Sequence, residues 1–244
     1  MSPHRTILGH VGELHRYPVK SLTGERLDEV EVDHRGVVGD RFWSVRDPDG
    51  KLGSGKSTRR FRRMDGLLAL RAAYDGETPV LTFPDRSVVR GDDPAVHAML
   101  SDHVGRPVTL AAEAEVSHFD EGPVHLVTTA SLAAITRVHG QEVDPRRLRP
   151  NVVVESVADL ADDDWAGCRL TVGDDVVLQV LYAMPRCVML DLPSADLTPA
   201  HGLLRTVTDA NGGDLGVVAD VLAPGRVSVG DPVSVSRWPP PRSS

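Results

Sequence analysis

The stretch RLTVGDDVVLQVL, from Arg169 to Leu181, contains two short apolar runs separated by a turn. The runs Arg169–Val172 and Val176–Leu181 are rich in valine and leucine, and β-branched residues favour strands. Gly173-Asp174-Asp175 between them is a short polar break of the kind that closes a β-hairpin. The stretch therefore predicts two antiparallel strands joined by a tight turn.

Short runs of this kind recur along the whole chain. We expect further strands over Ile7–Tyr17, Arg26–Asp33, Asp40–Val45, Leu67–Tyr74, Pro79–Phe83, Ser87–Val89, Val108–Ala111, Val124–Thr128, Val152–Glu155, Val217–Leu222, Val227–Val229 and Val233–Val235. One helix is expected from Asp93-Pro94 to Gly105 and another over Ser131–His139, and part of Ser194–Thr208 is expected to be helical. Many short strands with few helices predict a mainly β, α+β fold with β-barrel architecture.

Length and composition place the chain among ordinary globular proteins. Its 244 residues allow one large domain or two small ones, and 41% of them are hydrophobic and 25% charged. Residues 113–122 are polar, so we expect a boundary near residue 120. This gives an N-terminal domain over 1–120, a second domain over 121–237 and a loose tail over 238–244.

Net charge, apolar run length and cysteine content narrow the expected partners and cellular setting of the protein. The net charge of −8 argues against general nucleic-acid binding, and the chain has no run of about 18 apolar residues that would span a membrane. The first residues, MSPHRTILGH, are too short and too polar for a signal peptide. The two cysteines, Cys168 and Cys187, do not make a disulfide framework. We therefore expect a cytoplasmic, reducing setting, with no nucleic-acid partner and no membrane.

The stretch GKLGSGKST, from Gly50 to Thr58, matches the nucleotide-binding pattern G-x-x-x-x-G-K-[ST]. A working P-loop joins a buried strand to a helix whose N-terminus holds phosphate. Here Pro48-Asp49-Gly50 is a turn signal, and the residues after Lys56 show no apolar helical face. We therefore expect a hairpin bend with a basic end. Nucleotide hydrolysis, or phosphate binding by a flexible basic loop, are the alternatives.

Two polar stretches next to predicted strands are candidates for chemistry. In MPRCVMLD, Arg186 precedes Cys187, and a neighbouring guanidinium favours the thiolate form that attacks electrophiles and binds metals. An inert buried cysteine is the alternative there, and it is the expectation for Cys168. In RLRPNVVV, Arg149 and Asn151 flank a proline before a buried strand, so both can be held at one end of a sheet. A strand-entry turn with a solvated arginine is the alternative.

Together with further motifs, these stretches resemble one family. The matching motifs, in chain order, are Tyr17-Pro18-Val19-Lys20-Ser21, Gly39-Asp40-Arg41-Phe42-Trp43, the run VHLVTTASL from Val124, Arg149-Pro150-Asn151, Arg186-Cys187 and Val229-Gly230-Asp231-Pro232-Val233. The chain resembles the MOSC-domain proteins that carry an N-terminal MOSC β-barrel domain, a group that includes the mitochondrial amidoxime-reducing component. The resemblance spans nearly the whole chain and implies a MOSC-type β-barrel plus a smaller N-terminal β-rich domain.

The resemblance implies a molybdenum cofactor, a pterin with a terminal phosphate and a dithiolene that holds the metal. Cys187 matches the family's molybdenum ligand, and a soft thiolate suits such a metal. The residues that match cofactor contacts of the family are Lys20, Ser21, Ser54, Lys56, Thr128, Thr129, Ser131, Arg149, Asn151, Pro185 and Arg186. A solvated side chain is the alternative for Lys20, and helix capping is the alternative for the hydroxyl residues before Leu132. The chain departs from the family at Lys56, where the family has Arg, and at Val218, where some members have Tyr.

The resemblance further implies an oxidoreductase that uses Mo-molybdopterin to reduce N-hydroxylated small molecules by oxygen-atom transfer. The sequence contains no flavin, haem or iron–sulfur signature. A separate electron-donor protein, such as a ferredoxin, flavoprotein or reductase, is therefore implied. A second hypothesis is a carrier, in which Cys187 holds persulfide sulfur or bound cofactor for a partner.

Overall fold

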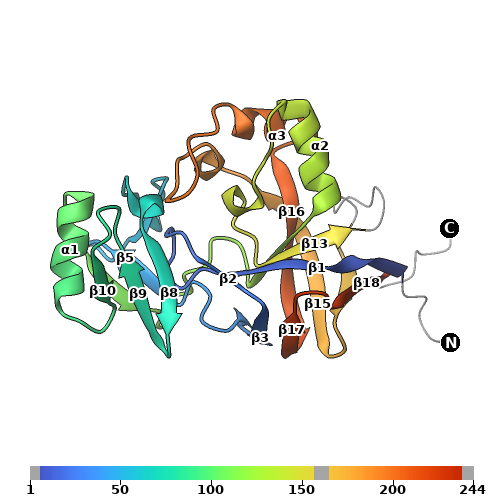
Figure 1. The fold of residues 1–244 in the computed structure, drawn as a ribbon, viewed down its shortest axis with the longest axis horizontal. Helices are drawn as coiled ribbons and strands as arrows, with labels where there is room; N and C mark the ends of the chain where they lie inside the picture. Colours follow the sequence, from blue (N-terminus) through green and yellow to red (C-terminus); the bar gives the residue numbers. More distant parts are fainter. Residues whose placement is uncertain (1–5, 157–164, 238–244) are drawn as a thin grey trace.

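The computed structural model describes residues 6–156 and 165–237. The strands, labelled as in Figure 1, are β1 (Thr6–Arg16), β2 (Glu25–Leu27), β3 (Glu29–Asp33), β4 (Gly36–Val37), β5 (Trp43–Arg46), β6 (Leu52–Ser54), β7 (Phe61–Arg63), β8 (Arg71–Asp75), β9 (Thr78–Thr82), β10 (Val88–Arg90), β11 (Thr109–Ala112), β12 (Val124–Thr128), β13 (Val152–Ser156), β14 (Cys168–Val172), β15 (Val176–Pro185), β16 (Asp214–Ala223), β17 (Gly225–Ser228) and β18 (Pro232–Arg237). The helices are α1 (Ala95–Val104), α2 (Thr129–His139) and α3 (Leu203–Asn211), and the 3₁₀ turns are η1 (Leu67–Ala69), η2 (Pro145–Arg147) and η3 (Val188–Leu190). The predicted loose tail over 238–244 lies outside the described residues. Strands dominate, so the predicted mainly β, α+β fold is confirmed.

Seven strands close into a barrel, at the right of Figure 1. They follow the order β13-β12-β16-β15-β14-β18-β1, and the pairing of β1 with β13 closes the ring. Neighbours are antiparallel except for β12 and β13, which run parallel and are connected through α2. Closure removes the open sheet edges that would otherwise pair with other chains.

The predicted hairpin forms two of these strands. β14 pairs with β15 in the register Arg169↔Gln179 to Val172↔Val176, so the turn lies at residues 173–175. β15 continues to Pro185, beyond the predicted end, because β16 pairs with it along its length. Valine and leucine side chains of these strands and of β1 fill the barrel core.

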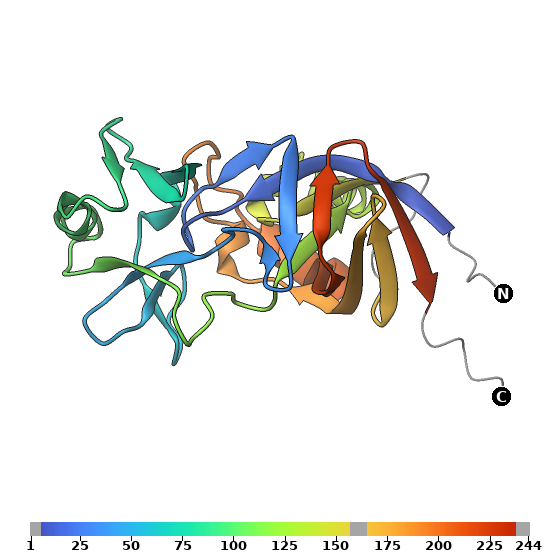
Figure 2. The ribbon, with the colours of Figure 1, turned by 90° about the horizontal axis from the view of Figure 1, so that it is seen from below.

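A second group of strands with its own core lies at the left of Figure 1, and Figure 2 shows the same separation from below. β8, β9 and β10 form one sheet, and β11, β5, β6 and β7 form another, with α1 against β11. Their shared core includes Leu22, Leu70, Leu81 and Leu100. α1 ends at Gly105, where the sequence predicts its end.

Strands from the start of the chain also take part in the barrel region. β1 lies in the barrel between β18 and β13, and β3 pairs with β17 in a small third sheet that includes β4. The division of the chain near residue 120 stays a prediction. Any such division must leave β1 and β3 together with strands after residue 121, because they share sheets with those strands.

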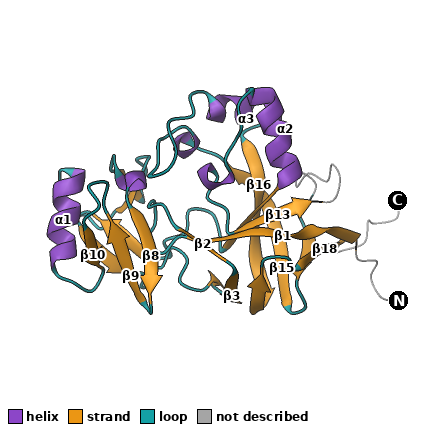
Figure 3. Ribbon diagram, viewed as in Figure 1, coloured by secondary structure: helices purple, strands orange, loops and turns teal. Residues whose placement is uncertain are grey.

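Two helices cover one side of the barrel. α2 and α3 pack against each other, and their core includes Val127, Leu132, Ile135 and Val207. Figure 3 shows both helices above the barrel strands. In the described part of the chain no helix has the length and apolar character needed to cross a membrane.

Three predicted strands are wrong in detail. Asp40–Val45 begins as a turn, and only Trp43–Arg46 pairs in a sheet. Arg26–Asp33 is two strands, because the chain passes at Asp28 from a pairing with β1 to a pairing with β17. Leu67–Tyr74 begins as the 3₁₀ turn η1, which follows Gly66 at φ 90°, and only Arg71–Asp75 pairs in a sheet. A short apolar run does not by itself distinguish a strand from a buried helical turn.

Candidate functional site

Cys187 lies where the chain leaves the barrel after β15. It has an extended conformation and begins η3, at the start of the segment 187–200 that we call the cysteine loop. Its side chain is half-buried and lines a small cavity of about 70 Å³. The charged residues around this cavity are Lys20, Arg41, Lys56, Asp120, Glu121, Arg147, Arg149 and Arg186. Cations therefore outnumber carboxylates beside the cysteine.

Lys20 reaches this cavity from the segment that follows β1. Its side chain is 2% exposed, and Nζ donates a 2.8 Å hydrogen bond to Asp120 Oδ1 and lies 4.6 Å from the centroid of the Phe61 ring. Burial lowers the pKa of Lys20 from 10.5 to about 8, although Asp120 acts to raise it. The next residue, Ser21, has φ 64° and donates from Oγ to the Gly53 carbonyl. Lys20 is therefore held in the site and is not a solvated side chain.

Two arginines and a tyrosine form a buried stack at the same place. Cζ of Arg149 and Cζ of Arg41 lie 4.3 and 4.8 Å from the centroid of the Tyr17 ring. Arg149 donates from Nη1 to the Leu22 carbonyl at 2.7 Å, and Arg41 pairs with Asp40. Burial lowers the pKa of Arg149 to about 10, and the positive charge of Arg41 acts in the same direction. Burial also raises the pKa of Tyr17 to about 12.

Two polar atoms of this stack have no partner. Arg149 Nη2 and the Tyr17 hydroxyl are buried and make no hydrogen bond within the described residues. A buried donor without a partner costs about 1–3 kcal/mol, and more when it is charged. Both atoms therefore suit a ligand that brings hydrogen-bond acceptors.

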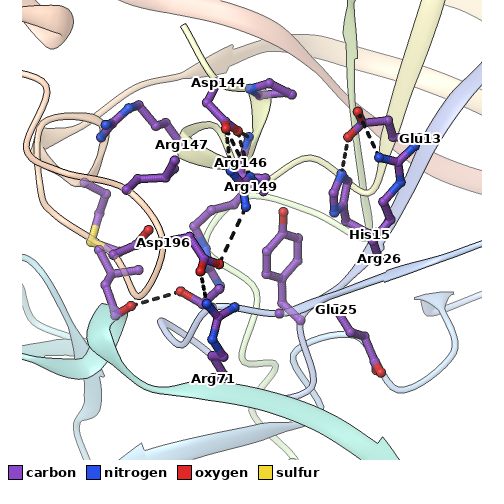
Figure 4. A pocket seen from close by; sticks show the side chains of 18 of the residues that line it. Glu13, His15, Glu25, Arg26, Arg71, Asp144, Arg146, Arg147, Arg149 and Asp196 are labelled. Atoms are coloured by element: carbon purple, nitrogen blue, oxygen red, sulfur yellow. Dashed lines mark hydrogen bonds and ion pairs between the residues drawn. The ribbon is translucent and has the colours of Figure 1, made fainter. Parts of the chain in front are cut away.

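Two members of the stack, Tyr17 and Arg149, also line a larger cavity of about 490 Å³ (Figure 4). Arg147, Arg149 and Met189 line both cavities, so the two adjoin. Ion pairs around the larger cavity, drawn in Figure 4, are Arg146 with Asp144 and Asp196, Arg71 with Asp196, and Glu13 with His15 and Arg26. Arg147 and Arg149 form no ion pair within the described residues and donate to backbone carbonyls. The volume is in the range of small-molecule sites.

The segment from Gly50 to Thr58 is not a P-loop: it runs from the hairpin turn between β5 and β6, through β6, into the connection before β7. Gly50 has φ 77° in the turn between β5 and β6, and the strand β7, not a helix, follows Lys56. Lys56 nevertheless lines the small cavity. Gly55 lies under the cysteine loop, since a Cβ there would be 2.3 Å from Met189 Sδ. The predicted hairpin is confirmed at Gly50, but Lys56 lies beyond it, in the connection between the parallel strands β6 and β7. That connection brings Lys56 to the cavity of Cys187.

Four other predicted contacts have backbone partners in the fold. Arg186 donates to two backbone carbonyls at 2.8 and 3.0 Å. Asn151 Nδ2 donates to the His15 carbonyl of β1, and Asn151 Oδ1 accepts from His125 N of β12; these bonds fix the start of β13. Ser54 is buried in β6, and Pro185 pairs with β16. Arg186 and Pro185 line the small cavity, whereas Ser54 and Asn151 line neither cavity. Their contacts with a cofactor stay predictions.

Thr128, Thr129 and Ser131 lie at the opposite end of β13 from Arg149. Thr128 Oγ1 accepts from Ser131 N at 3.1 Å as the N-cap of α2, and Thr129 Oγ1 accepts from Ser156 N at the end of β13. In the part of the chain that the structure describes, none of the three lines either cavity. The bond between Thr128 and Ser131 is that of helix capping, whereas Thr129 joins the start of α2 to the end of β13. Contact of the three with a cofactor stays a prediction.

Thr128→Ala should lower stability by about 1 kcal/mol and leave metal content unchanged. The substitution removes the hydroxyl that caps α2, and such losses cost about 0.5–2 kcal/mol. Urea unfolding of the parent, Thr128→Ala and Thr128→Ser measures the effect, because Ser keeps the cap. A folded Thr128→Ala protein that lost its metal would contradict this assignment and favour the cofactor contact.

Four residues of the site were not predicted as site residues. Tyr17 and Arg41 lie inside motifs that carry the family resemblance, so a signal for them was present. Asp120 lies in the polar connection after β11, and nothing in the sequence marks it as the partner of Lys20. Arg147 holds the cysteine loop through backbone carbonyls. Its closeness to Arg149 in the chain was the available signal.

Family comparison agrees with this fold. The MOSC domain matches residues 86–234, and the MOSC N-terminal beta barrel domain matches residues 8–117. The chain belongs to the MOSC domain family. The resemblance inferred from the motifs is thereby confirmed, and the barrel strands β12 to β18 of this MOSC protein lie mostly within the first match.

Relatives of this MOSC protein include two kinds of named protein. It is 25% identical to mitochondrial amidoxime-reducing component 1 of Homo sapiens, over 93% of this chain and 82% of the human protein. The identity is also 25% with mitochondrial amidoxime reducing component 2 of Bos taurus, over 75% of this chain and 66% of the bovine protein. Molybdenum cofactor sulfurase of Oryza sativa is 23% identical, over 75% of this chain and 28% of the rice protein. The YUAD protein from Bacillus subtilis has the same fold, with TM-score 0.53 at 17% identity, over 97% of this chain and 99% of that one.

Proposed function

We propose that this MOSC protein is a molybdenum-cofactor oxidoreductase that reduces N-hydroxylated small molecules, with Cys187 as the protein's ligand to the metal. One observation carries the proposal. The half-buried Cys187 lines the same small cavity as the buried cations Lys20 and Arg149, and this cavity adjoins the larger one. The names of the relatives support the cofactor class. The human relative is 25% identical, so the substrate class is part of this proposal.

The residues present fit a pterin cofactor with an anionic end. Arg149 Nη2 and the Tyr17 hydroxyl are buried without a partner, and pterin and phosphate groups offer the acceptors that these atoms need. The cavity of about 490 Å³ offers room for the pterin, next to Cys187. Among residues 6–156 and 165–237 no group of three or more His, Cys, Asp or Glu side chains is placed to hold a metal ion. The protein's contribution to the metal would therefore be a thiolate, added to the ligands that the cofactor brings.

When bound, the cofactor supplies a two-electron centre for oxygen-atom transfer. The residues of the chain bind and orient it: Cys187 anchors the metal end, and Lys20, Ser21 and Arg149 hold the polar edges. Lys56 offers a point charge and not the bidentate contact of an arginine, so it holds an anion with less directional preference. A separate ferredoxin, flavoprotein or reductase supplies electrons. A cytoplasmic setting, in which the thiols stay reduced, belongs to the same proposal.

Elemental analysis tests the proposal. The parent, Cys187→Ala and Cys168→Ala are purified from a host that makes molybdenum cofactor. We expect molybdenum in the parent and in Cys168→Ala, whose thiol is buried in β14. Cys187→Ala should retain roughly 10–100-fold less, because a lost metal ligand weakens binding at least as much as a lost supporting contact. The loaded parent should also reduce an amidoxime with a reduced viologen dye. Absence of molybdenum from the parent, with cofactor supply verified, would overturn the proposal.

The similarity to the rice sulfurase favours a second candidate function, a sulfur or cofactor carrier. In that case Cys187 would hold a persulfide or the cofactor for transfer to a partner. Cyanide-releasable sulfur in the parent, without stoichiometric metal and absent from Cys187→Ala, would support the carrier. Metal retained through repeated turnover would support the reductase.

A further inference from the structure

We propose that Lys20 is the proton donor to the oxygen that leaves the substrate, and that Asp120 is the residue that positions it. The inference rests on the proposed function, because it concerns the same site. It assigns catalysis to an amine that the family resemblance implicates only in holding the cofactor.

Reduction of an N-hydroxylated compound consumes protons as well as electrons. Cleavage of the N–O bond of R₂N–OH with two electrons and two protons gives R₂NH and water. In oxygen-atom transfer the hydroxyl hydrogen ends on the nitrogen, so both added protons end on the oxygen, which is released as water. The electrons come from the reduced cofactor, which the electron-donor protein restores. A donor placed beside this oxygen accelerates its release, typically by about 10²–10⁴-fold.

The lining of the small cavity leaves few groups able to donate this proton. It contains no His and no Tyr among the described residues that form it. Its arginines do not release protons near neutral pH, and Cys187 is committed to the metal. Carboxyl side chains ordinarily ionise well below neutral pH, and the charge of Lys20 lowers the pKa of Asp120 although burial acts to raise it. This leaves the two lysines, and Lys20 is the one that is fully enclosed, at 2% exposure.

The surroundings of Lys20 suit a proton donor at neutral pH. Burial lowers its pKa to about 8, Asp120 acts to raise it, and Arg41 and Arg149 act with burial. His118 also faces this region, and burial lowers its pKa to about 4, so it is uncharged at neutral pH. At pH 7 most of Lys20 is therefore the ammonium form, yet the proton is released more readily than from an ordinary lysine.

Asp120 links this amine to water. Its carboxylate accepts from Lys20 Nζ at 2.8 Å, and its side chain is 38% exposed. The bond directs the ammonium, and water at the exposed edge of the carboxylate can return the proton after each turnover. Asp120 thus acts through Lys20 and does not touch the reacting atoms itself.

The test compares the metal-loaded parent with Lys20→Arg and Asp120→Asn. Lys20→Arg keeps the positive charge that holds an anion but cannot release a proton near pH 8. We expect it to retain molybdenum and to lose roughly 10²–10⁴-fold in kcat. In the parent, kcat should fall as the pH rises through about 8, where the donor form is lost. In Asp120→Asn this fall should begin at lower pH, because the carboxylate that raises the pKa of Lys20 is gone.

A second measurement needs no activity. The chain has three lysines, Lys20, Lys51 and Lys56, so ¹³C-labelled lysine gives few Cε signals, which single Lys→Arg variants assign. In unloaded protein the Lys20 signal should titrate near pH 8 in the parent and at lower pH in Asp120→Asn, with the Lys51 signal as the internal reference.

The outcomes separate the two proposals. A parent without molybdenum overturns the proposed function. A loaded and fully active Lys20→Arg overturns this inference, as does an Asp120→Asn variant with an unchanged pH profile and an unchanged Lys20 titration. If Lys20→Arg loses metal, the Asp120→Asn profile and titration decide the matter.

Discussion

Asp40→Asn should lower the free energy of unfolding by about 3–5 kcal/mol. Asp40 is 0% exposed, with Oδ1 accepting from Tyr17 N at 2.8 Å and Oδ2 paired with Arg41. Asn keeps the shape and removes the charge. The Arg41 guanidinium then stays buried beside the like charge of Arg149, without the carboxylate that compensates its loss of solvation.

Urea unfolding of a double-mutant cycle measures this effect. The cycle consists of the parent, Asp40→Asn, Arg41→Gln and the double variant. The double variant should be less destabilised than the sum of the singles, because the uncompensated charge is gone. Asp49→Asn is the control, since its pair with Arg62 is exposed and should contribute less than about 1 kcal/mol. Equal effects at Asp40 and Asp49 would contradict the importance of the buried pair.

Gly216→Ala should lower stability by about 2–5 kcal/mol. Gly216, in β16, has φ 79°, which costs an L-residue about 1–2 kcal/mol. A Cβ there would also lie 2.6 Å from the Leu126 carbonyl oxygen and 2.8 Å from His125 Nε2. The carbonyl is backbone and cannot turn aside, so the strands must shift, and overpacking of this kind costs about 1–3 kcal/mol.

Gly140→Ala is a matched control for this prediction. Gly140, after α2, has φ 76° but no atom within 4 Å of the added Cβ. Both variants carry the same backbone penalty, so the difference between their unfolding free energies reports the crowding between β12 and β16. If the two variants were equally destabilised, the close approach at Gly216 would have no energetic weight.

Local sequence patterns predicted much of the fold. The hairpin around residues 173–175, the strand Val124–Thr128 and the end of α2 at Gly140 follow from residue type, turn chemistry and period, which act over a few residues. At Asp28 the chain stops pairing with β1 and begins to pair with β17. Which distant strand is available for pairing cannot be predicted from local sequence.

The site was predictable where a motif carries it. Cys187, Lys20 and Lys56 were each singled out, and all three line one cavity. The partner of Lys20 was not predictable, because Asp120 is 100 residues away in the chain and lies in a connection with no distinguishing pattern. The run VHLVTTASL shows a different difficulty. Its hydroxyl residues are suited equally to capping a helix and to holding a ligand. The structure shows the capping role of Thr128, and the ligand role stays a prediction.

The place of β1 in the barrel has a consequence for how the chain folds. β1 is synthesised before its neighbours β13 and β18, which follow it by more than a hundred residues along the chain. Pairings between such distant segments form slowly, because the chain must lose much of its freedom before the contacts form. Apart from the short pairing of Leu14–Arg16 with β2, the edges of β1 stay open until then, and open edges pair with other chains. The interval between the synthesis of β1 and that of β18 is therefore when this protein is most exposed to misassembly.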